Sequence, residues 1–213
     1  MNGLAAVLGA VLSAVGTALY LRDVWCGRTV PHRGSWAVWG VIAVLAAAAH
    51  GADGGRWSLL VLVGQGAGTV LVALLAVRRG AGRLTLGNAL LLSVAALGLL
   101  GWATLSDPTV ASACAVLADA AGLAVMWPKT WADPGSETLA TYALAAATGL
   151  LAALAVPAWD RDLLLFPVYF CVGNAATAGL IAVRRRAAGP VASAPGVRCG
   201  PVPEVVATVG SSR

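Results

Sequence analysis

The chain has 213 residues, of which 59% are hydrophobic and only 11% are charged, and its mean hydropathy is +0.84. Soluble domains carry about 25% charged residues, and fewer charges cannot cover a surface that faces water. The composition therefore excludes a soluble enzyme, a disordered chain and, despite the net charge of +5, a nucleic-acid-binding protein. It indicates an integral membrane protein whose length allows about seven helices.

Seven apolar runs, separated by turn-forming and charged residues, predict an all-α fold of seven transmembrane helices. In chain order the helices are expected at 3–21, 35–50, 57–77, 85–104, 109–127, 138–156 and 163–183. The first run lacks a basic leading segment, so we interpret it as a retained span rather than a signal peptide. Residues 187–213 are rich in Gly, Pro, Ala, Val and Ser and are predicted to be a disordered cytoplasmic tail.

Alternate loops hold almost all of the cations. Only Arg56 and Arg161 fall in the other set of loops. The positive-inside rule then predicts a plasma-membrane protein with its N-terminus outside and its C-terminus in the cytoplasm. The cations of the inner loops are Arg22, Arg28, Arg33, Arg78, Arg79, Arg83, Lys129, Arg184, Arg185 and Arg186.

An internal repeat relates two parts of the chain at a separation of 106 residues. The tetrapeptide at 76–79 (AVRR) recurs at 182–185, Trp25 matches Trp131, and Ser35-Trp36 matches Thr141-Tyr142. The first three helices thus correspond to the last three. Because three is an odd number, a fourth helix is needed for the second triplet to start in the same orientation as the first. The predicted membrane domain covers 1–186, with repeat one at 3–79, a linker helix at 85–104 and repeat two at 109–185, in a parallel 3+1+3 arrangement.

This arrangement over residues 3–186 resembles the SWEET and PQ-loop superfamily. The PQ dipeptide is absent, and Pro31-His32 and Trp127-Pro128-Lys129 stand in the corresponding stretches. The segments TVPHRGSWAVW and PKTWADPGSETLATY also look like those of a group of small bacterial seven-helix proteins. The SWEET resemblance implies a central cavity lined from the third and seventh helices, which makes Gln65 and Asn174 substrate-binding candidates. Interhelical hydrogen bonding is the alternative interpretation of both residues.

Asp119 is the leading candidate for chemistry because it lies well inside the fifth apolar run. A carboxylate in hydrocarbon is costly, so its side chain is expected to face the bundle interior. Desolvation favours the protonated form of a carboxyl, which would suit a proton donor at neutral pH. The alternative is a structural acid hydrogen-bonded to a neighbouring helix.

Two further acids, Asp23 and Glu137, flank the expected cytoplasmic mouth and are the other catalytic candidates. Asp23 closes the first helix beside Arg22, and a surface ion pair is its alternative interpretation. Glu137 stands at the start of the sixth helix beside Ser136, where a capping carboxylate is the alternative.

Aromatic side chains gather at the same end. Five Trp residues are expected at this inner end: Trp25, Trp36, Trp39, Trp127 and Trp131. The other three, Trp57, Trp102 and Trp159, are expected at the outer side. One interpretation is a pair of interfacial aromatic belts. The other is that Trp36, Trp39, Trp127 and Tyr20 shape a pocket, since indole faces attract cations.

No metal or cofactor is predicted. The two His residues are isolated in the sequence, and no Ser-His-Asp set, phosphate-binding loop or Asp-rich diphosphate motif occurs. The run GQGAG at 64–68 lies inside a span, where small residues allow close helix packing.

Size, helix number and intramembrane acids are similar to those of small bacterial membrane terpene cyclases of the drimane and indole-diterpenoid type. The Trp-Glu pair of their fungal relatives is absent. The resemblance implies a cyclase that protonates an alkene or epoxide of a lipophilic prenylated substrate without a metal, in functional partnership with a prenyltransferase. In that hypothesis Asp119 is the proton donor, and Glu137 or Asp23 is the second acid or terminal base.

Two other hypotheses remain beside the cyclase, which the sequence favours. A SWEET-like transporter of a small metabolite would use Gln65, Asn174 and Asp119 as a midplane site. A helical scaffold or partner subunit without chemistry would fit if Asp119 faced only neighbouring helices.

Overall fold

The computed structural model describes residues 2–52, 56–82, 85–105, 108–156 and 161–188, and these residues confirm the all-helical class. Apart from a single-residue bridge between His32 and Ala81, no β-structure occurs within them. The helices are α1 (Asn2–Trp25), α2 (Arg33–Ala52), α3 (Arg56–Arg79), α4 (Leu86–Leu105), α5 (Pro108–Ala132), a 3-10 turn η1 (Pro134–Ser136), α6 (Leu139–Ala155) and α7 (Arg161–Ala187). Residues 189–213, nearly all of the predicted tail, and the outer Trp residues, Trp57, Trp102 and Trp159, lie outside the described residues or side chains.

Three helices, α1, α5 and α7, end four or five residues later than the sequence predicts. The helix expected at 109–127 continues through Pro128 to Ala132, because an internal proline forfeits one backbone hydrogen bond without forcing termination. The helix expected at 3–21 continues to Trp25 and stops where Gly27 adopts a left-handed φ of 68°. That conformation is costly for other residues and commonly closes a helix.

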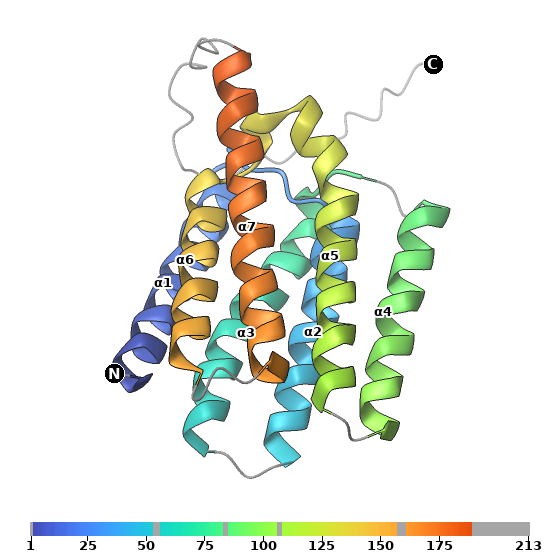
Figure 1. Cartoon of the computed structure of the whole chain (residues 1–213). Helices are drawn as coiled ribbons and strands as arrows, with labels where there is room; N and C mark the ends of the chain where they lie inside the picture. Colours follow the sequence, from blue (N-terminus) through green and yellow to red (C-terminus); the bar gives the residue numbers. More distant parts are fainter. Residues whose placement is uncertain (1, 53–55, 83–84, 106–107, 157–160, 189–213) are drawn as a thin grey trace, which may run out of the picture.

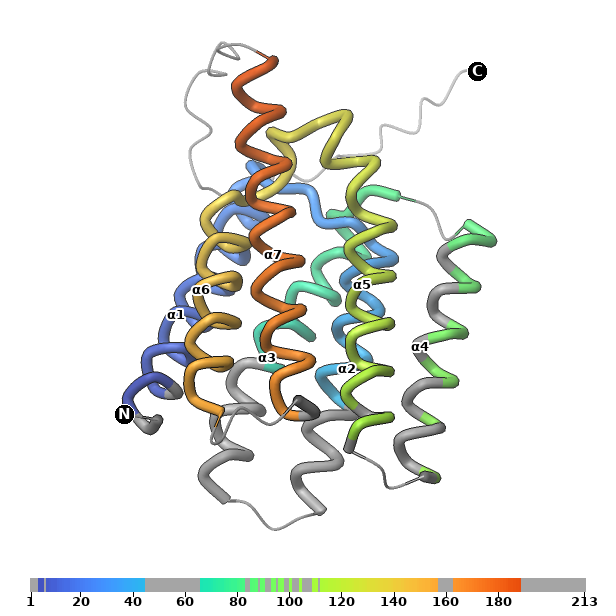
Figure 2. Tube along the Cα trace, viewed as in Figure 1, coloured from blue at the N-terminus to red at the C-terminus, as the bar shows by residue number. Residues whose placement is uncertain are grey.

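The helices form one bundle, with α4 at its edge against α5 (Figure 1). Within α1–α3, α3 packs against both α1 and α2, and within α5–α7, α7 packs against both α5 and α6. The contacts between these two triplets also match, because α1 packs on α6 and α2 packs on α5. The trace in Figure 2 shows α1 and α5 rising in the same direction.

A pair of cation–π contacts repeats at one end of the bundle. The Arg79 guanidinium lies 4.7 Å from the ring centroid of Trp25, and Arg184 lies 4.4 Å from that of Trp131. Each arginine also donates a hydrogen bond to the carbonyl of its tryptophan, at 2.9 Å and 3.1 Å. Trp25 and Trp131 are the residues that the internal repeat pairs, but the repeat aligns Arg79 with Arg185 rather than with Arg184. Each Trp is thus covered by an arginine from the end of a helix, and the two arginines are offset by one position in the repeat.

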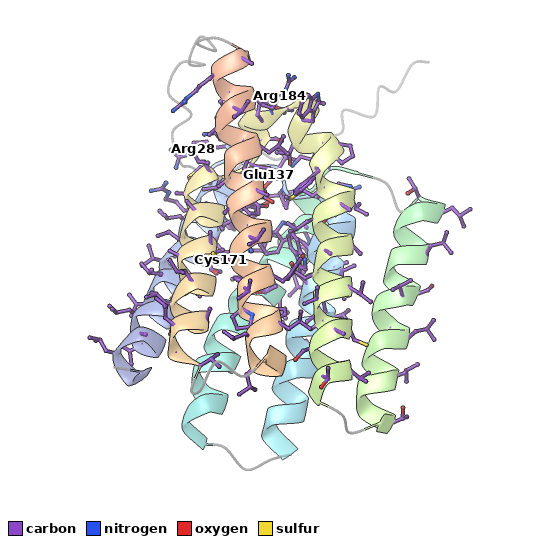
Figure 3. All side chains as sticks on the ribbon, in the orientation of Figure 1. Arg28, Glu137, Cys171 and Arg184 are labelled. Atoms are coloured by element: carbon purple, nitrogen blue, oxygen red, sulfur yellow. The ribbon has the colours of Figure 1, made fainter. Side chains whose placement is uncertain are left out.

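The bundle has an apolar exterior and one basic end. Leu and Val side chains are exposed along the helices, and in the described part of the chain two helical segments, Val7–Trp25 and Leu163–Ala187, are long and apolar enough to cross a membrane. Arg28 and Arg184 lie at the same end of the bundle (Figure 3), which we call the basic end. Glu137 lies below them, inside the bundle.

Candidate functional site

A cavity of about 410 Å³ lies between the two triplets, and we call it the central cavity. Its described lining includes residues from α1, α2, α3, α5, α6 and α7, and none from α4. It is bounded by Trp36 and Tyr142 near the basic end and reaches Ala152 and Phe166 toward the opposite end. Most of its wall is apolar, so the few polar groups on it determine which ligands it can recognise.

Asp119 lines the central cavity, as the sequence predicts for an acid that faces the interior. The Tyr169 hydroxyl donates a hydrogen bond of 2.9 Å to its Oδ2 atom. An ionised carboxylate accepts about four hydrogen bonds, and the described residues supply this one. Asp119 therefore keeps acceptor capacity for a molecule in the cavity.

Indole rings form part of the cavity wall beside Asp119. Trp36 and Trp39 both line it, and their rings meet edge to face with centroids 5.1 Å apart. A Cβ atom on Gly122 would lie 2.5 Å from Trp39 Nε1, so only glycine leaves room for this ring against α5. Gly122 is three residues beyond Asp119, which places Trp39 about one helical turn from the carboxyl group along α5.

The remaining polar side chains on the wall are small and neutral. Asn174 lines the cavity, as expected, and its Nδ2 atom donates a hydrogen bond of 2.8 Å to the Phe170 carbonyl. Gln65 belongs to α3, but its side chain lies outside the described residues. The described hydroxyl-bearing lining residues are Ser13, Thr17, Thr69, Thr141, Tyr142 and Thr148.

Glu137 is the centre of a buried hydrogen-bond network at the basic end. The hydroxyls of Tyr20 and Tyr142 each donate to its Oε2 atom at 3.0 Å, and Lys129 Nζ lies 2.5 Å from Oε1. Trp36 Nε1 in turn donates to the Tyr20 hydroxyl at 3.0 Å. We call these five residues the Glu137 network.

The Glu137 network joins the two triplets and backs the end of the cavity. Tyr20 and Trp36 come from α1 and α2, whereas Lys129 and Tyr142 come from α5 and α6. Lys129 also donates to the Val30 carbonyl, in the segment that links α1 to α2. Trp36 and Tyr142 line the cavity, but Glu137 and Tyr20 lie behind them. Tyr20 is thus a neighbour of the pocket rather than part of its described wall.

Glu137 has no capping role. The residue before α6 is Thr138, which makes no side-chain cap hydrogen bond, and the Ser136 hydroxyl donates to the Asp133 carbonyl. The capping interpretation was wrong because the Glu137 side chain points into the bundle, where it is 0% exposed. Burial raises the pKa of Glu137, and the adjacent Lys129 ammonium opposes that rise.

Asp23 and Trp127 lie outside the central cavity. Asp23 accepts from Arg22 and Arg28 at 3.0 Å and 3.1 Å, as the ion-pair interpretation predicts, and Thr138 donates to its second oxygen. Trp127 is 38% exposed on a shallow groove along α5 and α7, and its Nε1 atom donates to Thr177. The expected pocket-shaping position of Trp127 is therefore not observed.

Sequence reasoning missed three residues of these sites: Lys129, Tyr142 and Tyr169. Lys129 was counted only as a loop cation, because the helix was expected to end before Pro128. Tyr142 carried a usable signal, since the internal repeat pairs it with Trp36 and both line the cavity near the basic end. The sequence places Tyr169 in the last apolar run, where interhelical hydrogen bonding is its expected role, but the identity of its partner, Asp119, depends on how α5 and α7 pack.

Within the described ranges, no group of three or more His, Cys, Asp or Glu side chains is placed to hold a metal ion. Cys114 and Cys171 are free thiols in helices α5 and α7.

The chain shows no significant match to a protein-family model, to a curated protein or to a solved structure.

Proposed function

We propose that this chain is a seven-span transporter of a small metabolite, which binds in the central cavity between two repeated triplets of helices. In this proposal the spans follow the parallel 3+1+3 arrangement, with α4 as the linker. The basic end faces the cytoplasm and the N-terminus faces outside, in keeping with the positive-inside rule.

The matched packing of the two triplets supports the repeat. The third helix of each triplet contacts its other two helices, and the α1–α6 contact has its counterpart in α2–α5. Both Trp residues that the repeat pairs, Trp25 and Trp131, also have an arginine over the ring, although Arg79 and Arg184 are offset by one position in the repeat. Transporters built from repeats bind their substrates between the repeats and move one against the other.

The observation that carries the proposal is a cavity between the triplets, backed at one end by a network that joins them. If Trp36 and Tyr142 separated to open passage toward the basic end, the hydrogen bonds that cross between the triplets, from Tyr20 to Glu137 and from Lys129 to the Val30 carbonyl, would break. A network that crosses the interface can therefore act as a latch with a closed and an open state. In the closed state, Asp119 and Asn174 remain available to a ligand from the other side.

Uptake into proteoliposomes tests the transporter. A panel of labelled sugars and amines is expected to yield at least one compound with saturable flux above that of empty liposomes. Asn174→Ala is expected to reduce that flux, because Asn174 borders the cavity. Asp133→Asn, a change in an exposed turn, serves as the matched control. Absence of saturable flux across the panel contradicts the proposal, as does unchanged flux in Asn174→Ala.

A membrane terpene cyclase is the second candidate, favoured by the Asp119–Tyr169 pair on an aromatic wall. A protonating acid in a water-poor cavity, with indole faces for the resulting cation, would meet the needs of metal-free cyclisation. Because Glu137 and Asp23 lie off the described lining, Asp119 would be the acid and Trp36 and Trp39 would stabilise the cation.

Supplying membranes that contain the protein with a farnesylated or geranylgeranylated aromatic tests the cyclase. The hypothesis expects a cyclised product that Asp119→Asn abolishes. No product from the wild type, or an undiminished rate in Asp119→Asn, contradicts it.

A further inference from the structure

We infer that the central cavity recognises the protonated amine of a small, largely apolar molecule, with Asp119 as the counter-ion. The inference deepens the proposed transport function by assigning a chemical class to its substrate. It depends on charge, burial and the aromatic wall around Asp119.

The charge of the cavity lining favours a cationic ligand. Asp119 is the one charged residue in the described lining of the cavity. The other buried carboxylate, Glu137, has the Lys129 ammonium 2.5 Å from its Oε1 atom. Asp119 has no such cation among the described residues and receives the neutral Tyr169 hydroxyl instead. An ionised acid inside a bundle needs a partner, and a cationic ligand can be that partner.

The aromatic wall of the cavity favours the same class of ligand. Trp36 and Trp39 line the cavity, and the Trp39 ring lies against α5 about one turn from Asp119. Phe166 and Phe170 add aromatic surface on the α7 side, next to the Tyr169 that donates to Asp119. Aromatic faces attract ammonium groups and also bury apolar carbon, so both parts of such a ligand find complementary surface.

The same lining disfavours anions. No Lys, Arg or His occurs among its described residues, and a carboxylate ligand would face Asp119 without compensation. A neutral sugar would find hydroxyl groups and Asn174, but it would leave the Asp119 charge unpaired. Affinity is therefore expected to fall from amine to alcohol to carboxylate on one carbon skeleton.

Three ligands of the same shape test this order: phenethylamine, 2-phenylethanol and phenylacetate. Each is titrated into the purified full chain in detergent micelles at neutral pH, and binding is followed by tryptophan fluorescence. Phenethylamine is expected to bind at least about tenfold more tightly than 2-phenylethanol, with phenylacetate weakest. Equal or reversed affinities, or the absence of saturable amine binding, overturn the inference.

Variants assign the preference to one carboxyl group. Asp119→Asn is expected to abolish the difference between amine and alcohol while alcohol binding persists. Asp119→Glu is expected to retain the difference, as is Asp133→Asn, which alters an exposed carboxylate in a turn. A full amine preference in Asp119→Asn overturns the inference. If that variant does not fold, the wild-type ligand order and Asp119→Glu still decide it.

Binding in micelles requires no transport, so the two proposals can fail separately. An amine that binds through Asp119 but shows no saturable flux in proteoliposomes contradicts the transporter and leaves this inference standing. Saturable flux of a sugar, with no amine binding, overturns this inference and leaves the transporter standing.

Discussion

Asp119 and Glu137 are both carboxylates inside the bundle, but their surroundings differ. Glu137 accepts from two tyrosine hydroxyls and pairs with Lys129, and its side chain has no exposed surface. Asp119 accepts from Tyr169 and borders a cavity of about 410 Å³. Glu137 is therefore suited to hold the triplets together, whereas Asp119 is suited to meet a ligand.

This difference shows that burial alone does not identify a functional acid. A buried charge whose hydrogen-bond capacity is satisfied by the protein stabilises one arrangement of helices. A buried charge with spare capacity beside a cavity costs stability unless a ligand or water reaches it. The hydrogen-bond partners of the two acids thus distinguish a residue that holds helices together, Glu137, from a residue that can bind a ligand, Asp119.

The largest expected effect is on stability when the Glu137 side chain is removed. Glu137→Ala leaves the Lys129 ammonium without its counter-ion, and breaking a buried pair in this way costs about 3–5 kcal/mol. Asp119→Asn loses no ion pair among the described residues and is expected to cost about 1 kcal/mol or less. Unfolding in micelles, followed by circular dichroism, measures both.

A double variant separates loss of charge pairing from loss of packing. Lys129→Met combined with Glu137→Gln removes both charges and is expected to recover much of the stability that Glu137→Ala loses. Similar losses for Glu137→Ala and Asp119→Asn would mean that the two acids do not differ as described.

A smaller effect is expected when each carboxylate loses one tyrosine hydroxyl. Tyr20→Phe removes a fully buried donor to Glu137 and is expected to cost about 2 kcal/mol. Tyr169→Phe is expected to cost less than about 1 kcal/mol, because water in the cavity can replace the donor to Asp119. The same unfolding assay compares them, and a larger loss in Tyr169→Phe would reverse the assignment.

The smallest expected effect is a pH dependence at the basic end. His32 is buried beside Ser35, and burial, followed by the nearby Lys129 charge, lowers the pKa of His32. As pH falls below about 6.5, the unfolded chain binds a proton that the folded chain resists. The contribution of His32 to stability is therefore present above that pH and declines as the pH falls below it.

His32→Gln is the matched variant for this effect. Its free energy of unfolding, measured from neutral to mildly acidic pH, is expected to change less steeply than that of the wild type. Parallel slopes for the two proteins would remove His32 as the cause.

Apolar periodicity predicted the helices well, because the long apolar runs differ sharply in composition from the turn-forming and charged residues between them. The end of α5 was missed since Pro128 was expected to terminate the helix. The interior position of Asp119 was also predictable, because a carboxylate without a polar partner is costly on an apolar helix face.

The roles of the other residues depend on packing between distant segments, which local patterns do not encode. Tyr20 and Glu137 are 117 positions apart, and only the α1–α6 contact brings them together. Trp36 and Trp127 both looked like residues of an aromatic pocket. The structure places Trp36 on the cavity wall and Trp127 on the outer groove.

Carboxyl modification with dicyclohexylcarbodiimide tests the contrast between the two acids most directly. The reagent is apolar and reacts with carboxyl groups that it can reach, and mass spectrometry of peptides locates the adduct. We expect modification of Asp119, reduced by phenethylamine, and none of Glu137 in the same sample. Modification of Glu137 with Asp119 left unmodified would contradict the account.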